Sequence, residues 1–426
     1  MIGNMSEYLN RPLIQVINEA RRKVVTLEGA RSVGKTEFAQ TQLRQLGYSY
    51  VTLADEETYK NASSELTYWL GTLKLPVVID EAQRIKGLPL AVKEIVDRLP
   101  SGHPQFILTG SSLINRNGLD GQDPLARRVE RYTMDPLTQR ELIGNRHNLI
   151  DDLWAGRINP RFEKGISRED LYERMRTGGF PEYALNYPTL TERARRIQIR
   201  ADIDLVLGDN VLYGERLDRE NAKRILSKLL CMPGGILNAA SIGNELGMNR
   251  KTIDRYLSVF LHRFIIRALP NLRTAPNRQS SFARAKIHPV DTALSTEVLL
   301  DAGVDLMASR VDYGNLFESF AINQLMPPLQ WASDYYTPFY WRDSSNKPKE
   351  VDFVLYNRGR IIGVEMKSAA EIDREDFKGL AKLRDTDPRF TQGYVVYTGE
   401  RVIDWSKDFW ALPITALWEP DAFLYD

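Results

Sequence analysis

Eight residues near the N-terminus constrain this chain more than any other feature. Residues 29–36 read GARSVGKT; they follow a short β-branched run at residues 24–28 and precede a helical pattern that opens at Glu37. The two glycines let the backbone turn tightly and point its N–H groups at phosphate oxygens, and the helix start adds a favourable dipole. A loop of this composition between strand and helix predicts a phosphate-binding site on a parallel α/β sheet.

Each position of this loop has an expected role in binding ATP and Mg²⁺. Lys35 can reach the β- and γ-phosphates, and the Thr36 hydroxyl can ligate Mg²⁺. The whole loop would cradle the nucleotide, through Gly29, Ala30, Arg31, Ser32, Val33, Gly34, Lys35 and Thr36.

Two later apolar runs end in polar residues suited to the same chemistry. Residues 75–81 read LPVVIDE, so Asp80 would hold Mg²⁺ through water and Glu81 would polarise the attacking water. Residues 106–112 read FILTGSS, and Ser111 or Ser112 would sense the γ-phosphate. The carboxyl ends of parallel strands meet at one edge of a sheet, which predicts that these residues come together.

Arg127 and Arg128 follow the third of these strands. Either arginine could reach the γ-phosphate of a neighbouring subunit and stabilise transition-state charge. The alternative is a pair of solvated surface arginines, which is the commoner state of this residue type.

The segments VVIDEAQ, FILTGSS, PLARRVERYTMDPLTQREL and the GGFPE of residues 178–182 together resemble the AAA+-type ATPases of bacteria and archaea. More narrowly, they resemble the subgroup that carries a C-terminal domain of unknown function, over almost the whole chain. The resemblance implies ATP hydrolysis and a homo-oligomer such as a hexameric ring. Relatives often have glycine where Arg127 stands, which leaves open which arginine, if either, is a finger.

Beyond a helical lid or linker at residues 161–220, the pattern predicts a winged helix at residues 221–295. A short helix ends at Gly247, and a second opens after Asn249, which is typical of a helix-turn-helix. Its inward residues would be Ile253, Tyr256 and Leu257, and its outward, DNA-facing residues Arg250, Lys251 and Arg255. A following segment without acids would form a basic wing, with Arg273, Arg278, Arg284 and Lys286. The alternative is a lid or protein contact.

The last region, residues 296–426, predicts a small α/β domain around a hairpin. Glu365 and Lys367 are two apart on one strand and share a face, with Asp352 on the partner strand and Glu318 on a preceding helix. These four residues resemble the PD-(D/E)xK nuclease superfamily, which includes archaeal Holliday-junction resolvases and many restriction enzymes. Mg²⁺-dependent phosphodiester cleavage is the implied chemistry. The alternative is an inactive hairpin with salt-bridged charges.

Composition sets the remaining limits. The 57 basic and 56 acidic side chains nearly cancel, so a DNA surface must be a local patch. The single Cys231 excludes an internal disulfide, and four scattered histidines disfavour a zinc site. No signal-peptide core and no run of about 18 apolar residues is present, so we expect a cytoplasmic protein without a membrane span.

These observations predict an α/β chain with a parallel-sheet ATPase domain at residues 1–160, followed by the lid, winged helix and nuclease-like domain. The leading functional hypothesis is a Mg²⁺-dependent ATPase acting on DNA, in genome maintenance or defence. A core of this type followed by a winged helix also resembles Holliday-junction branch-migration motors. One alternative is an ATP-dependent switch or toxin–antitoxin-like regulator whose C-terminal domain binds protein. Another is a nuclease gated by its ATPase domain.

Overall fold

The computed structural model of the chain describes residues 9–100, 102–114, 123–186, 189–206, 217–272 and 284–425. By internal packing the chain forms two compact units. The first contains residues 1–136 together with 262–264, and the second contains residues 137–261 and 265–426. Apart from residues 262–264, the expected lid, winged-helix and nuclease-like segments thus share the second unit, which also contains residues 137–160. The physical reason is that Leu149, Ile150 and Leu153 pack into the large core of the second unit.

The first unit is built on a five-stranded parallel sheet, as the sequence predicts. Its strands are β1 (Val24–Glu28), β2 (Ser49–Thr52), β3 (Val77–Asp80), β4 (Phe106–Gly110) and β5 (Val129–Thr133). Their order across the sheet is β2-β3-β4-β1-β5, and each neighbouring pair runs parallel. Strand β1 therefore lies between β4 and β5. The loops that follow β1, β3 and β4 leave the sheet at the same edge.

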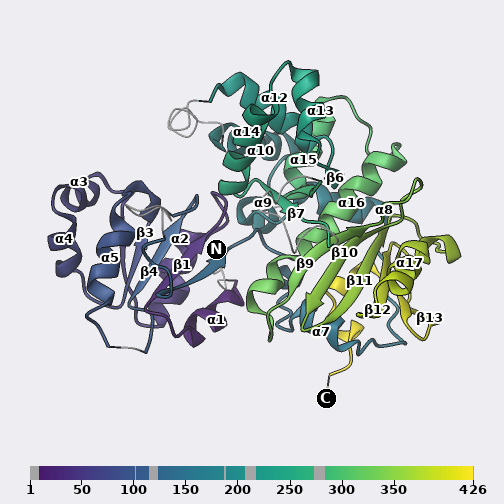
Figure 1. The fold of residues 1–426 in the computed structure, drawn as a ribbon, viewed down its shortest axis with the longest axis horizontal. Coiled ribbons are helices and arrows are strands. Elements are labelled where there is room, and N and C mark those ends of the chain that lie inside the picture. Colours follow the sequence, from purple (N-terminus) through teal and green to yellow (C-terminus); the bar gives the residue numbers. More distant parts are fainter. Residues whose placement is uncertain are drawn as a thin grey trace. The chain divides into compact units, whose positions relative to one another are not determined.

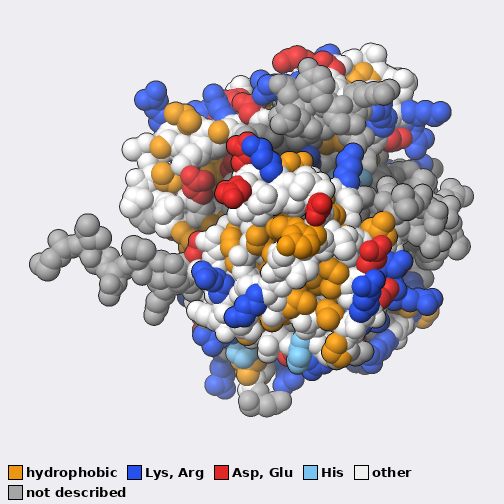
Figure 2. All heavy atoms as spheres, turned by 90° about the vertical axis from the view of Figure 1, so that its left-hand side faces the viewer, with side chains coloured by type: hydrophobic (Ala, Val, Ile, Leu, Met, Phe, Trp, Pro, Cys, Tyr) orange, Lys and Arg blue, Asp and Glu red, His pale blue; other side chains and the backbone are white. Residues whose placement is uncertain are grey.

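Helices flank this sheet (Figure 1). They are α1 (Leu13–Glu19), α2 (Lys35–Phe38), which continues into a π-helical turn at Ala39–Leu43, α3 (Glu56–Ser64), α4 (Leu66–Thr72), the 3₁₀ turn Ala82–Arg84 and α5 (Leu88–Val96). Strands β1, β3 and β4 are buried along their whole length, as expected for parallel strands covered on both faces. Figure 2 looks onto the α3–α4 side of this unit, where hydrophobic side chains gather at the centre with charged ones around them.

The helical part of the second unit contains the two helices that the sequence predicts on either side of Gly247. Its helices are α6 (Gln139–Leu142), α7 (Leu149–Ala155), α8 (Arg168–Thr177), α9 (Pro181–Asn186), α10 (Glu192–Val206), α12 (Arg219–Leu230), α13 (Ala239–Leu246), α14 (Arg250–His262) and α15 (Thr292–Asp301). Gly247 ends α13 with φ of 69°, and the Asn249 side chain accepts a hydrogen bond from Thr252 N at 2.9 Å. Both signals were read from the sequence correctly.

A small antiparallel sheet accompanies these helices. It consists of β6 (Gly235–Ile236), β7 (Ile266–Leu269) and β8 (Lys286–Pro289), in the order β6-β8-β7. Strand β8 lies in the middle, and backbone hydrogen bonds join it to β6 on one side and to β7 on the other. Arg273 and Arg278, predicted for the wing, lie outside the described residues.

The C-terminal part is a six-stranded mixed sheet in the order β13-β14-β12-β11-β10-β9. The strands are β9 (Thr337–Arg342), β10 (Glu350–Asn357), β11 (Arg360–Lys367), β12 (Phe390–Tyr397), β13 (Ile403–Ser406) and β14 (Phe409–Pro413). Helices α16 (Arg310–Leu325) and α17 (Lys378–Thr386) belong to the two hydrophobic clusters that cover its faces. Short 3₁₀ turns lie at Pro327–Trp331, Arg374–Phe377, Ile414–Leu417 and Pro420–Ala422.

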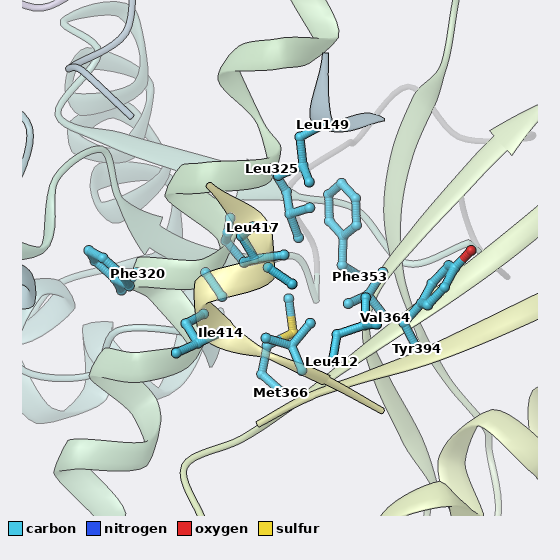
Figure 3. Close-up of a cluster of buried hydrophobic side chains, with 14 of the residues drawn as sticks. Leu149, Phe320, Leu325, Phe353, Val364, Met366, Tyr394, Leu412, Ile414 and Leu417 are labelled. Carbon is cyan, nitrogen blue, oxygen red and sulfur yellow. The ribbon is translucent and has the colours of Figure 1, made fainter. Parts of the chain in front are cut away.

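Alternation along the strands divides the side chains between these two clusters. In Figure 3, Phe353 of β10 lies close to Leu325 of α16, with Val364 and Tyr394 of the strands beside it, and Phe320 of α16 belongs to the same cluster. The intervening residues Val354, Ile361 and Val395 join Leu380 and Leu383 of α17 instead. This period-two division is what a sheet with helices on both faces requires. No helix among the described residues is both long and apolar enough to cross a membrane.

Candidate nucleotide site and carboxylate cluster

The loop after β1 has the backbone geometry of a phosphate-binding turn. Ser32 and Gly34 take positive φ values of 64° and 92°, and α2 begins directly at Lys35. Gly29 has a separate steric role, because a Cβ added there would lie 2.2 Å from Met134 O. The backbone of the loop and the end of β5 therefore approach too closely for any other residue at position 29.

Lys35 is held inside this loop. Its Nζ donates hydrogen bonds to Gly29 O at 2.9 Å and Ala30 O at 2.6 Å, and only 6% of the residue is exposed. Burial lowers the pKa of Lys35 to about 8, although the nearby Glu81 and Asp80 carboxylates act to raise it. An anionic ligand at the loop would favour the charged form of this lysine.

Asp80, the last residue of β3, joins the loop to the neighbouring strands. Its Oδ2 accepts hydrogen bonds from Thr36 Oγ1 at 2.8 Å and from Tyr50 OH at 2.9 Å. Its Oδ1 accepts from Thr109 Oγ1 of β4 and from Glu81 N. The structure thus brings Thr36 and Asp80 together as predicted. A hydroxyl and a carboxylate at this separation are hard oxygen donors that fit Mg²⁺.

Glu81 is positioned by a residue that sequence reasoning missed. It takes a left-handed backbone conformation with φ of 57°, directly after β3. Gln83 Nε2 donates to Glu81 Oε2 at 2.5 Å and to Ser111 Oγ at 3.1 Å. Gln83 therefore bridges the predicted water-activating carboxylate and the predicted γ-phosphate sensor. Its place two residues after Glu81 in the DEAQ segment was the available signal.

The two candidate finger arginines have different environments within this chain. Arg128 pairs with Asp97, with Nη2 at 2.9 Å from Oδ2. Arg127 is exposed and has a positive φ of 67°. Whether either reaches a second copy of the chain stays a prediction. Ser112, the other candidate sensor, is partly buried after β4.

The expected DNA-facing residues of α14 lie on its exposed side. Ile253, Tyr256 and Leu257 are buried, which confirms the predicted inward face. Arg250, Lys251 and Arg255 are exposed, and Arg250 lies 3.6 Å from Asp254 in a surface ion pair. Arg284 is also exposed. The charges are therefore available at the surface, and their role on DNA stays a prediction.

The four nuclease-like residues converge as the sequence predicts. Glu318 extends from α16, Asp352 lies on β10, and Glu365 and Lys367 lie on β11. Lys367 Nζ lies 2.8 Å from Glu365 Oε1, and Asp352 Oδ2 accepts a hydrogen bond from Met366 N at 2.9 Å. The hairpin between β10 and β11 therefore sets this part of the cluster.

A fifth residue occupies the middle of the cluster, and its expected place was wrong. Lys286, counted among the basic residues of the wing, is buried with 3% of its side chain exposed. Its Nζ lies 2.8 Å from Glu318 Oε1, 2.8 Å from Asp352 Oδ1 and 2.6 Å from Glu350 Oε1. The Lys286 side chain leaves β8 toward α16 and β10, where its ammonium neutralises buried carboxylates.

Electrostatics in the cluster follow from burial and crowding. Burial, together with the charge of Asp352, raises the pKa of Glu318 to about 8 and that of Glu365 well above its usual value. Burial acts to lower the pKa of Lys286, but Asp352, Glu318 and Glu350 raise it well above its usual value. Lys286 thus keeps its proton. Burial and the nearby Lys286 charge lower the pKa of His288, which is neutral.

Within the described residues, no three His, Cys, Asp or Glu side chains are arranged to hold a metal ion. The Lys286 ammonium lies between the carboxylates that would have to converge. The donor set itself is chemically suited to Mg²⁺, since it consists of carboxylates, but its present geometry pairs with an ammonium.

The GGFPE segment has a structural explanation. Asp291 is fully buried at the start of α15, and its Oδ2 accepts hydrogen bonds from Gly179 N at 2.7 Å and Phe180 N at 3.0 Å. A Cβ on Gly178 would lie 1.8 Å from Asp291 Oδ1, and one on Gly179 would lie 2.1 Å from Leu137 O. The paired glycines therefore make room for this carboxylate and for the backbone at Leu137.

Several solved structures show distant similarity to this chain. The Walker-type ATPase of Pyrococcus abyssi is 15% identical with a TM-score of 0.41, covering 67% of this chain and 93% of that one. The RuvB Holliday-junction branch-migration motor of Thermotoga maritima is 18% identical with a TM-score of 0.26, covering 60% and 87%. A STAND signal-transduction ATPase with a tetratricopeptide-repeat sensor from Pyrococcus horikoshii is 14% identical with a TM-score of 0.24, covering 76% and 49%.

Family models divide the chain into three matched segments. Residues 168–304 and 313–417 each match a family described as a domain of unknown function, DUF8612 and DUF4143 respectively. No curated protein matches the chain. Residues 21–143 match the family described as an AAA domain, and they contain the loop, Asp80, Glu81 and the parallel sheet described above. Residues 21–143 are therefore a P-loop ATPase domain of the AAA type.

Proposed function

We propose that this chain is a Mg²⁺-dependent ATP hydrolase that acts on DNA. The observation that carries the hydrolase part is the 2.8 Å hydrogen bond between Thr36 Oγ1 and Asp80 Oδ2, with Glu81 as the next residue. It joins the phosphate-binding loop to the carboxylate strand in one chain. These are the contacts that position a nucleotide and its metal for hydrolysis.

The residues divide the work of the reaction. The backbone N–H groups of residues 29–36 hold the phosphates, and Lys35 turns from its carbonyl partners to the β- and γ-phosphates. When bound, Mg²⁺ neutralises charge on the phosphates, with Thr36 and Asp80 as its holders. Glu81 orients the attacking water, and Ser111 senses the γ-phosphate at the end of β4. An arginine from a second copy, Arg127 or Arg128, completes the charge stabilisation in a homo-oligomer such as a hexameric ring.

The hydrolase proposal is tested by ATP turnover with Mg²⁺ in three proteins. Lys35→Ala should lose both ATP binding and turnover, whereas Glu81→Gln should bind ATP and fail to hydrolyse it. Lys60→Ala, which changes an exposed surface lysine of α3, is the matched control. Turnover that survives in Lys35→Ala would refute the assignment.

The proposed action on DNA is supported by the exposed Arg250, Lys251 and Arg255 at the start of the second helix of the helix-turn-helix. Turnover is measured with single-stranded, duplex and four-way-junction DNA. We expect stimulation, and we expect it to be lost when the three residues are changed to Glu. Turnover indifferent to every DNA would favour the alternative, an ATP-dependent switch or toxin–antitoxin-like regulator whose C-terminal domain binds protein.

A second candidate activity is metal-dependent cleavage of DNA by the C-terminal domain. It is favoured by the convergence of Glu318, Asp352, Glu365 and Lys367 around one cluster. Cleavage is tested with Mg²⁺ or Mn²⁺ and DNA, with and without ATP. Asp352→Asn should abolish cleavage and leave ATP turnover intact. If the wild type leaves every DNA intact under all these conditions, the activity is refuted.

A further inference from the structure

Lys286 has three carboxylate partners and comes from a different part of the fold than they do. It lies on β8, the middle strand of the three-stranded sheet, whereas Glu318 lies on α16 and Glu350 and Asp352 lie on β10. All three Nζ to oxygen distances are between 2.6 and 2.8 Å. An ammonium with three donors and three carboxylate partners is fully satisfied.

The other cations around the cluster are already engaged. Arg342 Nη1 lies 2.9 Å from Glu350 Oε2, and Lys367 pairs with Glu365. Lys286 is the cation that forms ion pairs with both Glu318 and Asp352. Removing its charge would leave two carboxylates buried together, which is strongly unfavourable.

Two buried polar atoms beside the cluster lack a hydrogen-bond partner within the described part of the chain. They are Glu365 Oε2, in a residue 8% exposed, and His288 Nε2, in a residue 0% exposed. His288 Nε2 lies 3.8 Å from Glu318 Oε1. Buried polar atoms are normally paired, so unpaired ones point to a group that the site can still accept.

We propose that Lys286 is a plug: its ammonium stands in for a divalent cation between Glu318, Glu350 and Asp352, and such a cation binds only when Lys286 withdraws. Glu365 and His288 supply the unused donor atoms of the opened site. In the plugged state the chain keeps its buried carboxylates neutralised without metal. The inference uses the nuclease-like arrangement proposed above, but metal binding rather than cleavage tests it.

Withdrawal of Lys286 has a structural requirement. Leu269 pairs with Lys286 in the β7–β8 register, and Leu237 N donates to Ala285 O at 2.8 Å. His288, two residues further on, faces Ser319 of α16 through a 2.9 Å contact at Nδ1. The ammonium can therefore leave by a change of side-chain rotamer or by a shift of β8 together with its neighbours.

The test is Mn²⁺ binding to the full-length, nucleotide-free protein. The concentration of free Mn²⁺ is measured by electron paramagnetic resonance. Lys286→Met should bind Mn²⁺ at least about tenfold more tightly than the wild type, because a like charge is removed from the site. The gain should disappear in Lys286→Met combined with Glu365→Gln. Lys228→Met, which removes a lysine paired with Glu245 at 2.5 Å in the same unit, is the matched control and should behave as the wild type.

Equal Mn²⁺ binding by the wild type and Lys286→Met would overturn the plug, as would a gain that survives the Glu365→Gln change. If Lys286→Met does not fold alone, it and Lys286→Gln are refolded with Mn²⁺ or with K⁺, and ATP turnover of every sample is then measured in the same Mg²⁺ buffer. Recovery with Mn²⁺ but not with K⁺ at equal ionic strength supports the plug, and no recovery of either variant overturns it. Tight Mn²⁺ binding without DNA cleavage would leave the plug standing and refute only the nuclease activity.

Discussion

At the scale of single residues, Gln83 is the side chain whose role is least visible in the sequence and most direct in the structure. Its Nε2 amide donates hydrogen bonds to both Glu81 Oε2 and Ser111 Oγ. The carboxylate that we propose to orient water thus shares a hydrogen-bond donor with the proposed γ-phosphate sensor. A change of occupancy at the sensor can alter the orientation of Glu81 through this amide.

We expect Gln83→Ala to lower kcat for ATP by about tenfold to a hundredfold, because a mispositioned general base loses part of its effect. KM should stay near the wild-type value, since Gln83 does not contact the phosphate-binding loop in this structure. Steady-state ATP turnover measures both constants. The control is Gln105→Ala, which removes a partly buried side chain that donates to His103 O. Equal losses in both variants would contradict the positioning role.

Asp291 gives the second residue-scale prediction, on pH and stability. Burial raises the pKa of Asp291 from 3.8 to about 6, even though the N–H groups of Ala293, Gly179 and Phe180 act to lower it. The folded state therefore holds this proton more tightly than the unfolded chain. The stabilisation that protonated Asp291 gives the folded state is complete below pH 3.8 and is lost as pH rises to about 6.

The measurement is urea unfolding of the wild type and Asp291→Asn across this pH range. The free energy of unfolding of the wild type relative to the variant should fall by up to about 3 kcal/mol as pH rises. An amide does not titrate, so the variant removes this dependence and keeps the side-chain shape. A difference between the two proteins that is constant with pH would contradict the assignment.

At the scale of elements, the sequence predicts the strand ends, loops and helix ends that depend on residues adjacent in the chain. The run before Asp80, the GARSVGKT loop and Gly247 predict a strand end, a loop and a helix end, and the structure has them there. Lys286 was misplaced because its partners lie 32 to 66 positions away. A lysine in a basic segment is ordinarily solvated, and only tertiary pairing reverses that preference. The partner of GGFPE, Asp291, is similarly remote in sequence.

The turn between α8 and α9 yields a prediction about the GGFPE segment. Gly178→Ala should destabilise the second unit by at least about 2 kcal/mol more than a control glycine change, because its Cβ would collide with the fixed Asp291 carboxylate. The control is Gly303→Ala, which has a similar φ of +79° and open space around it. It should cost about 1 kcal/mol from backbone strain alone. Thermal or urea unfolding of both variants gives the comparison, and equal costs would refute the steric argument.

At the scale of the whole molecule, the two packing units have separate cores, and the proposed nucleotide site belongs to the first unit alone. Residues 29–36, Asp80 and Glu81 all belong to the first unit. Calorimetry should therefore show that Mg²⁺ and a non-hydrolysable ATP analogue stabilise the transition of the first unit. At about 100 times its Kd, the ligand adds about 2.7 kcal/mol. Lys35→Ala should show no shift, and a shift confined to the second unit would place the nucleotide elsewhere.

The close approach of Gly29 to Met134 has a mechanical meaning. Met134 N donates to Glu28 O at 2.7 Å, and Arg11 Nη2 donates to Asp135 O at 2.8 Å. Pro136 is the last residue of this stretch, and the second unit begins at Leu137. Gly29, the first residue of the phosphate-binding loop, thus packs against Met134 in residues 134–136, which connect the first unit to the second in sequence. A ligand that shifts this loop would therefore press directly on the segment that joins residues 1–136 to the rest of the chain.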